Sequence, residues 1–173
     1  MEPEDKTDSQ STRYKEITKE QLTTTLDSHK LWIQSDGKEG ARADLSKTNL
    51  KGAVIVGTPL QKAIFSGAYL YGAYLKRSNL KDADLSGANL RGANLRWADL
   101  QNANLSGTNL TRVDIMKADL RKADLSKVQN LSCDQLKSAS IDKSTILPSY
   151  IKINWISEKE YDCQKVTPVP VKK

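Results

Sequence analysis

The stretch ADLSGANLRGANLRWADLQNANL, residues 83–105, places a leucine at every fifth position and an alanine two residues before each leucine. The same spacing runs from Leu45 to Leu125 without interruption. Seventeen large apolar residues follow one another at intervals of five, namely fourteen leucines, Ile55, Phe65 and Ile115. A period of five fits neither the 3.6-residue period of a helix nor the two-residue period of a strand. All seventeen side chains can share one side only if the chain turns a corner every five residues, which predicts a four-sided solenoid.

The repeating unit is Ala-Asp/Asn-Leu followed by two variable positions, as in residues 83–87, 88–92 and 98–102. In this unit the sequence resembles the pentapeptide-repeat family. The resemblance implies an all-β solenoid, a right-handed quadrilateral β-helix in which four units form a coil and seventeen units form about four coils. We expect the leucine and the small residue two places before it to point inward. The Asp or Asn between them should bond to the backbone of the turn.

The sequence outside the repeats predicts short α-helical caps at both ends. Thr18 with Gln21, and Ser132 with Gln135, have the spacing of a capping box at the start of a helix. Such caps would cover the unpaired strand edges that an open β-solenoid exposes. We therefore divide the chain into a disordered tail (1–15), a capping helix with the loop after it (16–40), the repeats (41–130), a second capping helix and turn (131–148), and an apolar segment followed by a mobile tail (149–173).

Composition and charge limit the class of protein. The 173-residue chain has no apolar run long enough to span a membrane, and its polar N-terminus does not resemble a secretory signal. Two cysteines, Cys133 and Cys163, favour free thiols in a reducing cytoplasm, with a disulfide between them as the alternative. Residues 41–128 hold fourteen Lys or Arg against seven Asp, so the net charge of +7 makes the predicted rod the basic part of the chain.

Catalytic chemistry has little support. The only histidine, His29, lies in the predicted N-terminal helix without a partner motif, and no metal-ligand spacing is present. Asp99 and Asp119 would stack on adjacent coils at a separation that suits a glycosidase, about 5 Å. They would nevertheless lie on a flat convex wall without a cleft, which favours solvated turn aspartates. We expect no enzymatic activity, no cofactor and no metal.

A stacking period of twenty brings basic and aromatic residues together on one wall. The candidate polyanion-binding site consists of Lys76, Arg77, Arg96, Trp97 and Lys117, and Trp97 is expected to stack between Arg77 and Lys117. Basic groups beside an aromatic ring suit phosphate-rich partners. The alternative is that these cations only keep the rod solvated.

A second candidate site lies in the first two coils, where apolar side chains occupy outward positions. Its members are Val54, Val56, Ile64, Tyr69, Tyr71 and Tyr74. An exposed apolar patch usually indicates a contact. The covering group could be residues 149–156 of the same chain, a second copy in a homodimer, or a partner protein.

These observations favour a non-enzymatic protein–protein interaction scaffold that presents a rigid repeat surface. The alternative is weak nucleic-acid or polyanion binding through the basic and aromatic wall, and no membrane contact is expected. The family resemblance adds a third function, because some pentapeptide-repeat proteins bind type II topoisomerases as DNA mimics. That mimicry requires an acidic surface, so the net charge of this short rod disfavours it.

Overall fold

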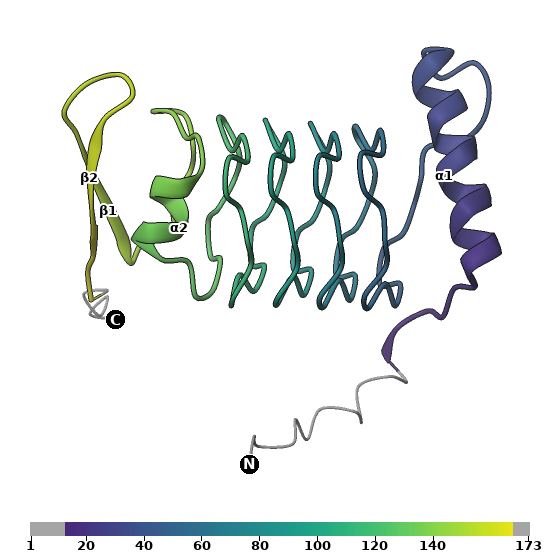
Figure 1. Cartoon of the computed structure of the whole chain (residues 1–173), viewed down its shortest axis with the longest axis horizontal. Helices are drawn as coiled ribbons and strands as arrows, with labels where there is room; N and C mark the ends of the chain where they lie inside the picture. Colours follow the sequence, from purple (N-terminus) through teal and green to yellow (C-terminus); the bar gives the residue numbers. More distant parts are fainter. Residues whose placement is uncertain (1–12, 168–173) are drawn as a thin grey trace, which may run out of the picture.

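The computed structural model describes residues 13–167, which form a rod of stacked coils with one helix near each end (Figure 1). Helix α1 spans Lys19–Gln34 and helix α2 spans Cys133–Ser138. Strands β1 (Ile151–Trp155) and β2 (Tyr161–Lys165) follow α2 as an antiparallel hairpin at the far end of the rod. Between the helices the chain winds as a β-helix solenoid held by short parallel bridges.

Between Asp44 and Gln129 the bridges form four ladders in which each residue pairs with the residue twenty positions later. We number these walls as faces. The first face joins Asp44, Ile64, Asp84, Asn104 and Asp124; the second joins Asn49, Tyr69, Asn89, Asn109 and Gln129; the third joins Val54, Tyr74, Asn94 and Asp114; the fourth joins Pro59, Asn79, Asp99 and Asp119. The five-residue period therefore produces the four-sided stack that the sequence predicts.

The inside of the rod is a column of stacked apolar side chains. All seventeen residues at the five-residue positions are at most 3% exposed, and the small residues two places before them are buried too, except Ala53 and Thr58 in the first coil. Removing a leucine side chain from water contributes about 1.5–3 kcal/mol. This burial explains why an unbroken period of five specifies the fold.

The corners depend on two local features. The side-chain oxygen of the Asp or Asn accepts a hydrogen bond from the N–H two residues later, as from Ser86 to Asp84 (3.0 Å) and from Arg96 to Asn94 (3.1 Å). The second residue after each leucine has a positive φ, which suits Gly57 (+65°) and is uncommon for a bulky residue such as Trp97 (+56°).

The N-terminal end is covered by α1 and by the segment before it. Thr18 and Gln21 form the predicted capping box, and the buried His29 ring accepts a hydrogen bond at Nδ1 from the Ala43 N–H (3.1 Å). Lys15 forms a parallel bridge with Thr48, so the predicted disorder of residues 1–15 is wrong at Lys15. Residues 1–12, the rest of that predicted tail, lie outside the described residues.

The C-terminal end corrects two further predictions. Cys133 at the start of α2 and Cys163 in β2 form a disulfide with Cα atoms 5.6 Å apart, so the free-thiol interpretation is wrong. The same bond and the pairing of β1 with β2 order the chain through Lys165, where a mobile tail was expected. Residues 168–173 lie outside the described part of the chain.

The apolar segment 149–156 packs at this C-terminal end. The Tyr150 hydroxyl donates to the Val128 carbonyl (2.9 Å) and accepts from the Leu131 N–H (3.0 Å), and Ile151 is buried. In Figure 1 this hairpin lies at the opposite end of the rod from α1 and the first coils. The segment therefore does not cover the tyrosines of the first two coils.

Candidate protein-binding face

The third face brings members of both candidate sites onto one wall. Val54 and Tyr74 are neighbours in its ladder, and Val56 precedes Lys76 and Arg96 in the column beside it. Val54, Val56 and Tyr74 are 73%, 48% and 51% exposed, and a contiguous exposed apolar patch usually marks a contact. An apolar area at the N-terminal end of the face thus continues into the basic and aromatic residues of the later coils.

Trp97 is the centre of the basic part of the face. Its ring centroid lies 4.9 Å from the Lys76 Nζ, 5.4 Å from the Arg77 Cζ and 4.7 Å from the Arg96 Cζ. These are cation–π distances, so the ring and the three cations position one another. The expected stacking of Trp97 on Arg77 is present, whereas Lys117 makes no such contact with the ring among the described residues.

Most of these cations have no carboxylate partner. Arg96 pairs with Asp114 at 3.2 Å, but within residues 13–167 no salt bridge involves Lys76, Arg77 or Lys117. Four cations against Asp114 give the face, residues 53–57, 73–77, 93–97 and 113–117, a net charge of +3. An anionic group that approaches it meets positive charge that no internal carboxylate neutralises.

The other members of the apolar set lie on different faces and are only half exposed. Ile64 is on the first face, and Tyr69 and Tyr71 are on the second, where their ring centroids are 6.1 Å apart. Tyr14 stacks on Tyr69 at 5.0 Å, so the segment before α1 contacts Tyr69. Sequence reasoning missed Tyr14, because its only signal is one aromatic residue in a polar segment.

Tyr71 has cations on both sides. The Nζ of Lys51 and the Cζ of Arg91 lie 6.0 Å and 5.8 Å from its ring centroid. The second face has three cations and no acidic residue in residues 48–52, 68–72, 88–92 and 108–112, and it adjoins the third face at the corner. The first and fourth faces, in contrast, have net charges of −1 and +1. The positive potential of the rod is therefore concentrated on two adjacent walls.

The side chains of Asp99 and Asp119 are engaged in structural hydrogen bonds. The Asp119 carboxylate accepts from the Arg121 Nε at 2.9 Å, and this hydrogen bond holds the pKa of Asp119 below its usual value. Asp99 accepts from the Gln101 N–H at 3.1 Å, as a turn residue does. A carboxylate held ionised by arginine is a poor proton donor. Among residues 13–167, no group of three or more His, Cys, Asp or Glu side chains could hold a metal ion.

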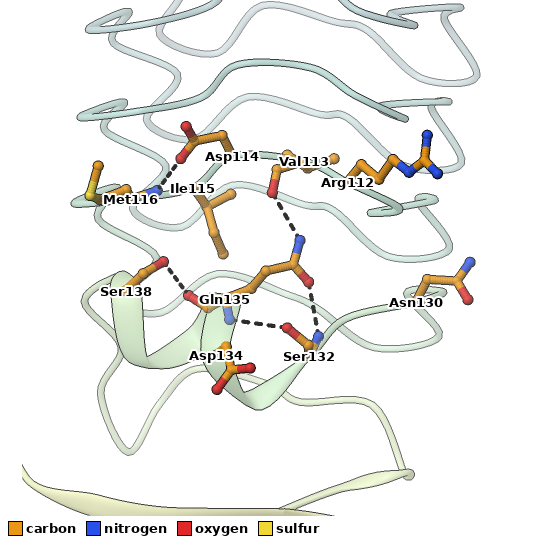
Figure 2. A pocket seen from close by; sticks show the side chains of 10 residues that line it. All are labelled: Arg112, Val113, Asp114, Ile115, Met116, Asn130, Ser132, Asp134, Gln135 and Ser138. Atoms are coloured by element: carbon orange, nitrogen blue, oxygen red, sulfur yellow. Dashed lines mark hydrogen bonds between the residues drawn. The ribbon is translucent and has the colours of Figure 1, made fainter.

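A cleft of about 600 Å³ lies between the last regular coil and α2. Figure 2 shows Gln135 reaching from α2 to the coil, where its Nε2 donates to the Val113 carbonyl (2.9 Å) while its Oε1 accepts from the Ser132 N–H (2.9 Å). Gln135 also donates to the Leu110 carbonyl (3.1 Å). Its amide is therefore engaged in attaching the helix to the coil.

The stacked coils define a repeat solenoid, and the comparison with protein families identifies which one. The pentapeptide-repeat model matches residues 41–67, 56–92 and 93–128 with eight copies, which together cover about half of the chain. The protein belongs to the pentapeptide-repeat family. No match was found among functionally curated proteins.

Solved structures of the family are similar in sequence. A pentapeptide repeat protein (Rfr23) from the cyanobacterium Cyanothece 51142 is 34% identical over 64% of this chain and 68% of that chain, with a TM-score of 0.39. One from the Arabidopsis thaliana thylakoid lumen is 32% identical over 54% and 68%, with a TM-score of 0.34. HetL from Nostoc sp. strain PCC 7120, involved in heterocyst differentiation regulation, is 30% identical over 62% and 58%, with a TM-score of 0.31.

Neither α1 nor any other helix within residues 13–167 is long and apolar enough to cross a membrane.

Proposed function

We propose that this protein is a non-enzymatic scaffold that binds an acidic protein partner on its third face. The observation that supports the proposal most directly is the continuity of exposed Val54, Val56 and Tyr74 with the cations around Trp97. Protein contacts typically combine an apolar area with charged groups that select the partner. HetL, a relative involved in heterocyst differentiation regulation, belongs to the same family.

The apolar positions replace residues that have a role in the turn. Where later coils place Asn94 or Asp114, whose side chains accept the N–H two residues on, the first two coils place Val54 and Tyr74, which cannot accept. The turn gives up a hydrogen bond there, worth roughly 0.5–1.5 kcal/mol. The loss of this hydrogen bond at positions with exposed apolar side chains supports a role for Val54 and Tyr74 in a contact.

The surroundings of Trp97 favour an acidic protein over nucleic acid. Single-stranded nucleic acid binds by stacking bases on exposed aromatic rings, and such stacking needs an open ring face. The Trp97 ring is half-buried and has three cations within 5.4 Å of its centroid. Lys76 and Arg77, which have no salt bridge within residues 13–167, can still pair with carboxylates. Mimicry of DNA is disfavoured as well, because the rod has a net charge of +7.

A charge reversal on one face tests this function. In the variant Lys76→Glu, Arg77→Glu, Lys117→Glu, the Arg96–Asp114 ion pair is untouched. The matched control reverses three cations of the fourth face, Lys62, Lys81 and Lys122. The measurement is biolayer interferometry on immobilised poly-L-glutamate and on single-stranded DNA, at low and moderate salt.

We expect poly-L-glutamate to bind and to be released by salt. Reversal on the third face should weaken binding at least about tenfold, a change of about 1.4 kcal/mol, and the control variant should weaken it less. Equal losses in both variants would remove the third face as the site. Tighter binding to DNA than to poly-L-glutamate would favour the nucleic-acid alternative.

The disulfide bears on where this scaffold acts. The expectation of a cytoplasmic location rested partly on two free thiols, and the bond between Cys133 and Cys163 removes that argument. We propose that the chain matures in a compartment where disulfides form and persist. Labelling of thiols in native extract tests this, because a protected disulfide leaves neither cysteine labelled before reduction.

A further inference from the structure

We propose that the partner docks as an extended acidic segment that adds a β-strand to the first coil at Val54 and inserts one apolar side chain beside α1. This inference rests on the proposed function and names the chemistry of the partner. At the edge of the solenoid, the first coil has no coil before it to pair with.

The four sides of this edge differ in how they are protected against the addition of a strand. On the second face, Lys15 pairs with the coil through its N–H to Lys47 (2.8 Å) and its carbonyl to Asn49 (2.8 Å). On the fourth face, Pro59 has no N–H to offer. On the first face, the edge residue is the charged and exposed Asp44. Pairing, proline and charge are three known ways in which proteins prevent unwanted strand addition.

The third side has none of these protections. Val54 is 73% exposed, and neither its N–H nor its carbonyl has a hydrogen-bond partner within residues 13–167. One coil later, the equivalent Tyr74 uses both groups, donating to Ala53 (2.8 Å) and accepting from Ile55 (2.8 Å). Val54 thus offers the donor and the acceptor that an added strand requires.

A groove lies beside this open edge. It has a volume of about 390 Å³ and runs between the first coil and the start of α1. Its apolar lining comes from Ile17, Leu22, Leu26, Leu50, Ala53 and Val54. The groove is large enough for an apolar side chain, and a strand paired with Val54 can place one there because alternate residues point to opposite sides.

The charges around the groove select the occupant. Lys19 and Lys51 line it, both are exposed, and neither has a salt bridge within the described residues. Three acidic residues are next to this lining in sequence: Glu16, which accepts a hydrogen bond from the Asn49 side chain (3.0 Å), Glu20 and Asp27. Farther along the third face come Lys76 and the other cations around Trp97. An extended segment with an apolar residue flanked by Asp or Glu matches this pattern.

Pro59 suggests a substitution at Val54 that tests strand addition. Pro59 occupies the same place in its repeat as Val54, in the same coil, so the solenoid tolerates proline at this position. Val54→Pro removes the N–H that an added strand needs and disturbs no hydrogen bond within residues 13–167. Val54→Thr keeps the N–H and serves as the matched control.

The experiment selects short linear peptides from a displayed random library on the full-length wild-type protein, and measures the enriched peptides by fluorescence anisotropy. We expect acidic peptides with a central apolar residue. Val54→Pro should weaken their binding at least about tenfold, about 1.4 kcal/mol, and Val54→Thr should change it less than about twofold. A peptide methylated at the backbone nitrogen that donates to the Val54 carbonyl, an acceptor that Val54→Pro retains, should also lose binding to the wild-type protein.

Other results would overturn the inference. If peptides bind Val54→Pro as well as wild type but fail on the third-face charge reversal, strand addition is wrong and the proposed function stands. If both variants bind fully, both proposals fail. A library that yields no peptide dependent on Val54 also overturns strand addition. A Val54-dependent dimer in sedimentation would assign the edge to a second copy. If removal of residues 1–12 creates new peptide binding, the occupant of the edge at Val54 is this chain's own N-terminal segment.

Discussion

His29 attaches α1 to the first coil through one buried hydrogen bond. Because its Nδ1 accepts from the Ala43 N–H, the ring must be neutral for this contact to form. Burial lowers the pKa of His29, the backbone of Gln61 opposes this shift, and Arg42 adds to it. The residue that sequence reasoning set aside as non-catalytic is therefore a structural contact that titrates.

We predict that the stability of the wild-type protein falls as the pH drops below about 6.5, the value of an unfolded histidine. The folded-state pKa of His29 is lower, so between the two values the unfolded chain holds a proton that the folded chain lacks. His29→Asn, which keeps an acceptor near Nδ1, should show a smaller loss. Thermal unfolding at about pH 7.5 and about pH 5.5 measures the difference.

The interval from about pH 7.5 to about pH 5.5 separates the titration of His29 from that of the carboxylates whose pKa values are shifted. The pKa values of Glu20, Asp44 and Asp119 are lowered, so these groups contribute stability that is lost only at more acidic pH. An equal loss of stability in wild type and His29→Asn would contradict the assignment.

The C-terminal hairpin is the element that depends most on a single covalent bond. Among the described residues, β1 and β2 pair only with each other, and the disulfide links β2 to the start of α2 across 30 residues of sequence. On the model in which a disulfide restricts the unfolded chain, closing a loop of this length contributes about 3–4 kcal/mol. The hairpin should therefore be the first part to open when the bond is removed.

We predict that Cys133→Ser, Cys163→Ser protein loses amide protection in residues 151–165 while the repeats stay protected. Repeat coils are stabilised by their neighbours, so the loss at one end should not spread far. Hydrogen exchange with mass spectrometry measures both regions, and reduced wild-type protein is the control. Loss of protection in residues 83–105 would show that the bond stabilises the whole rod.

At the scale of the whole molecule, one stacked core runs the length of the rod. Leu90 is fully buried in the middle coils, and the Asn89–Asn109 and Tyr69–Asn89 bridges connect its coil to both neighbours. A change at this position acts on two interfaces at once.

We predict that Leu90→Asp destabilises the protein by several kcal/mol, because it buries a carboxylate among apolar side chains. Arg91→Asp, one residue later and facing outward, should cost less than about 1 kcal/mol. Urea unfolding followed by circular dichroism compares the two. Leu90→Asp protein with the wild-type midpoint would contradict the inward orientation of the leucines.

The walls of the rod differ although their backbone is the same. The third face combines exposed apolar residues with a net charge of +3, whereas the first face, with a net charge of −1, is polar over most of its length. A rigid rod holds these side chains in columns before any partner arrives, which reduces the ordering that binding requires.

The sequence by itself determined the solenoid, the inward leucines and the columns of the outward residues. These follow from a period of five and a stacking distance of twenty, and contacts between neighbouring coils repeat regularly enough to be derived by counting. The placement of Val54 above Tyr74, and of Trp97 beside Arg77, came from this counting alone.

Only the tertiary structure decided which contacts form at the two ends of the rod and between outward side chains. In the structure, Cys133 forms a disulfide with Cys163, and Tyr14 stacks on Tyr69. The backbone of Val54 has no hydrogen-bond partner within residues 13–167. The Trp97 ring contacts Lys76 and Arg96, whereas contact with Lys117 was expected. The physical reason is that these contacts join segments outside the repeat or depend on side-chain conformation, and neither follows the period. The open edge that supports strand addition exists because Lys15 pairs with the second side of the first coil and no described segment pairs with Val54 on the third.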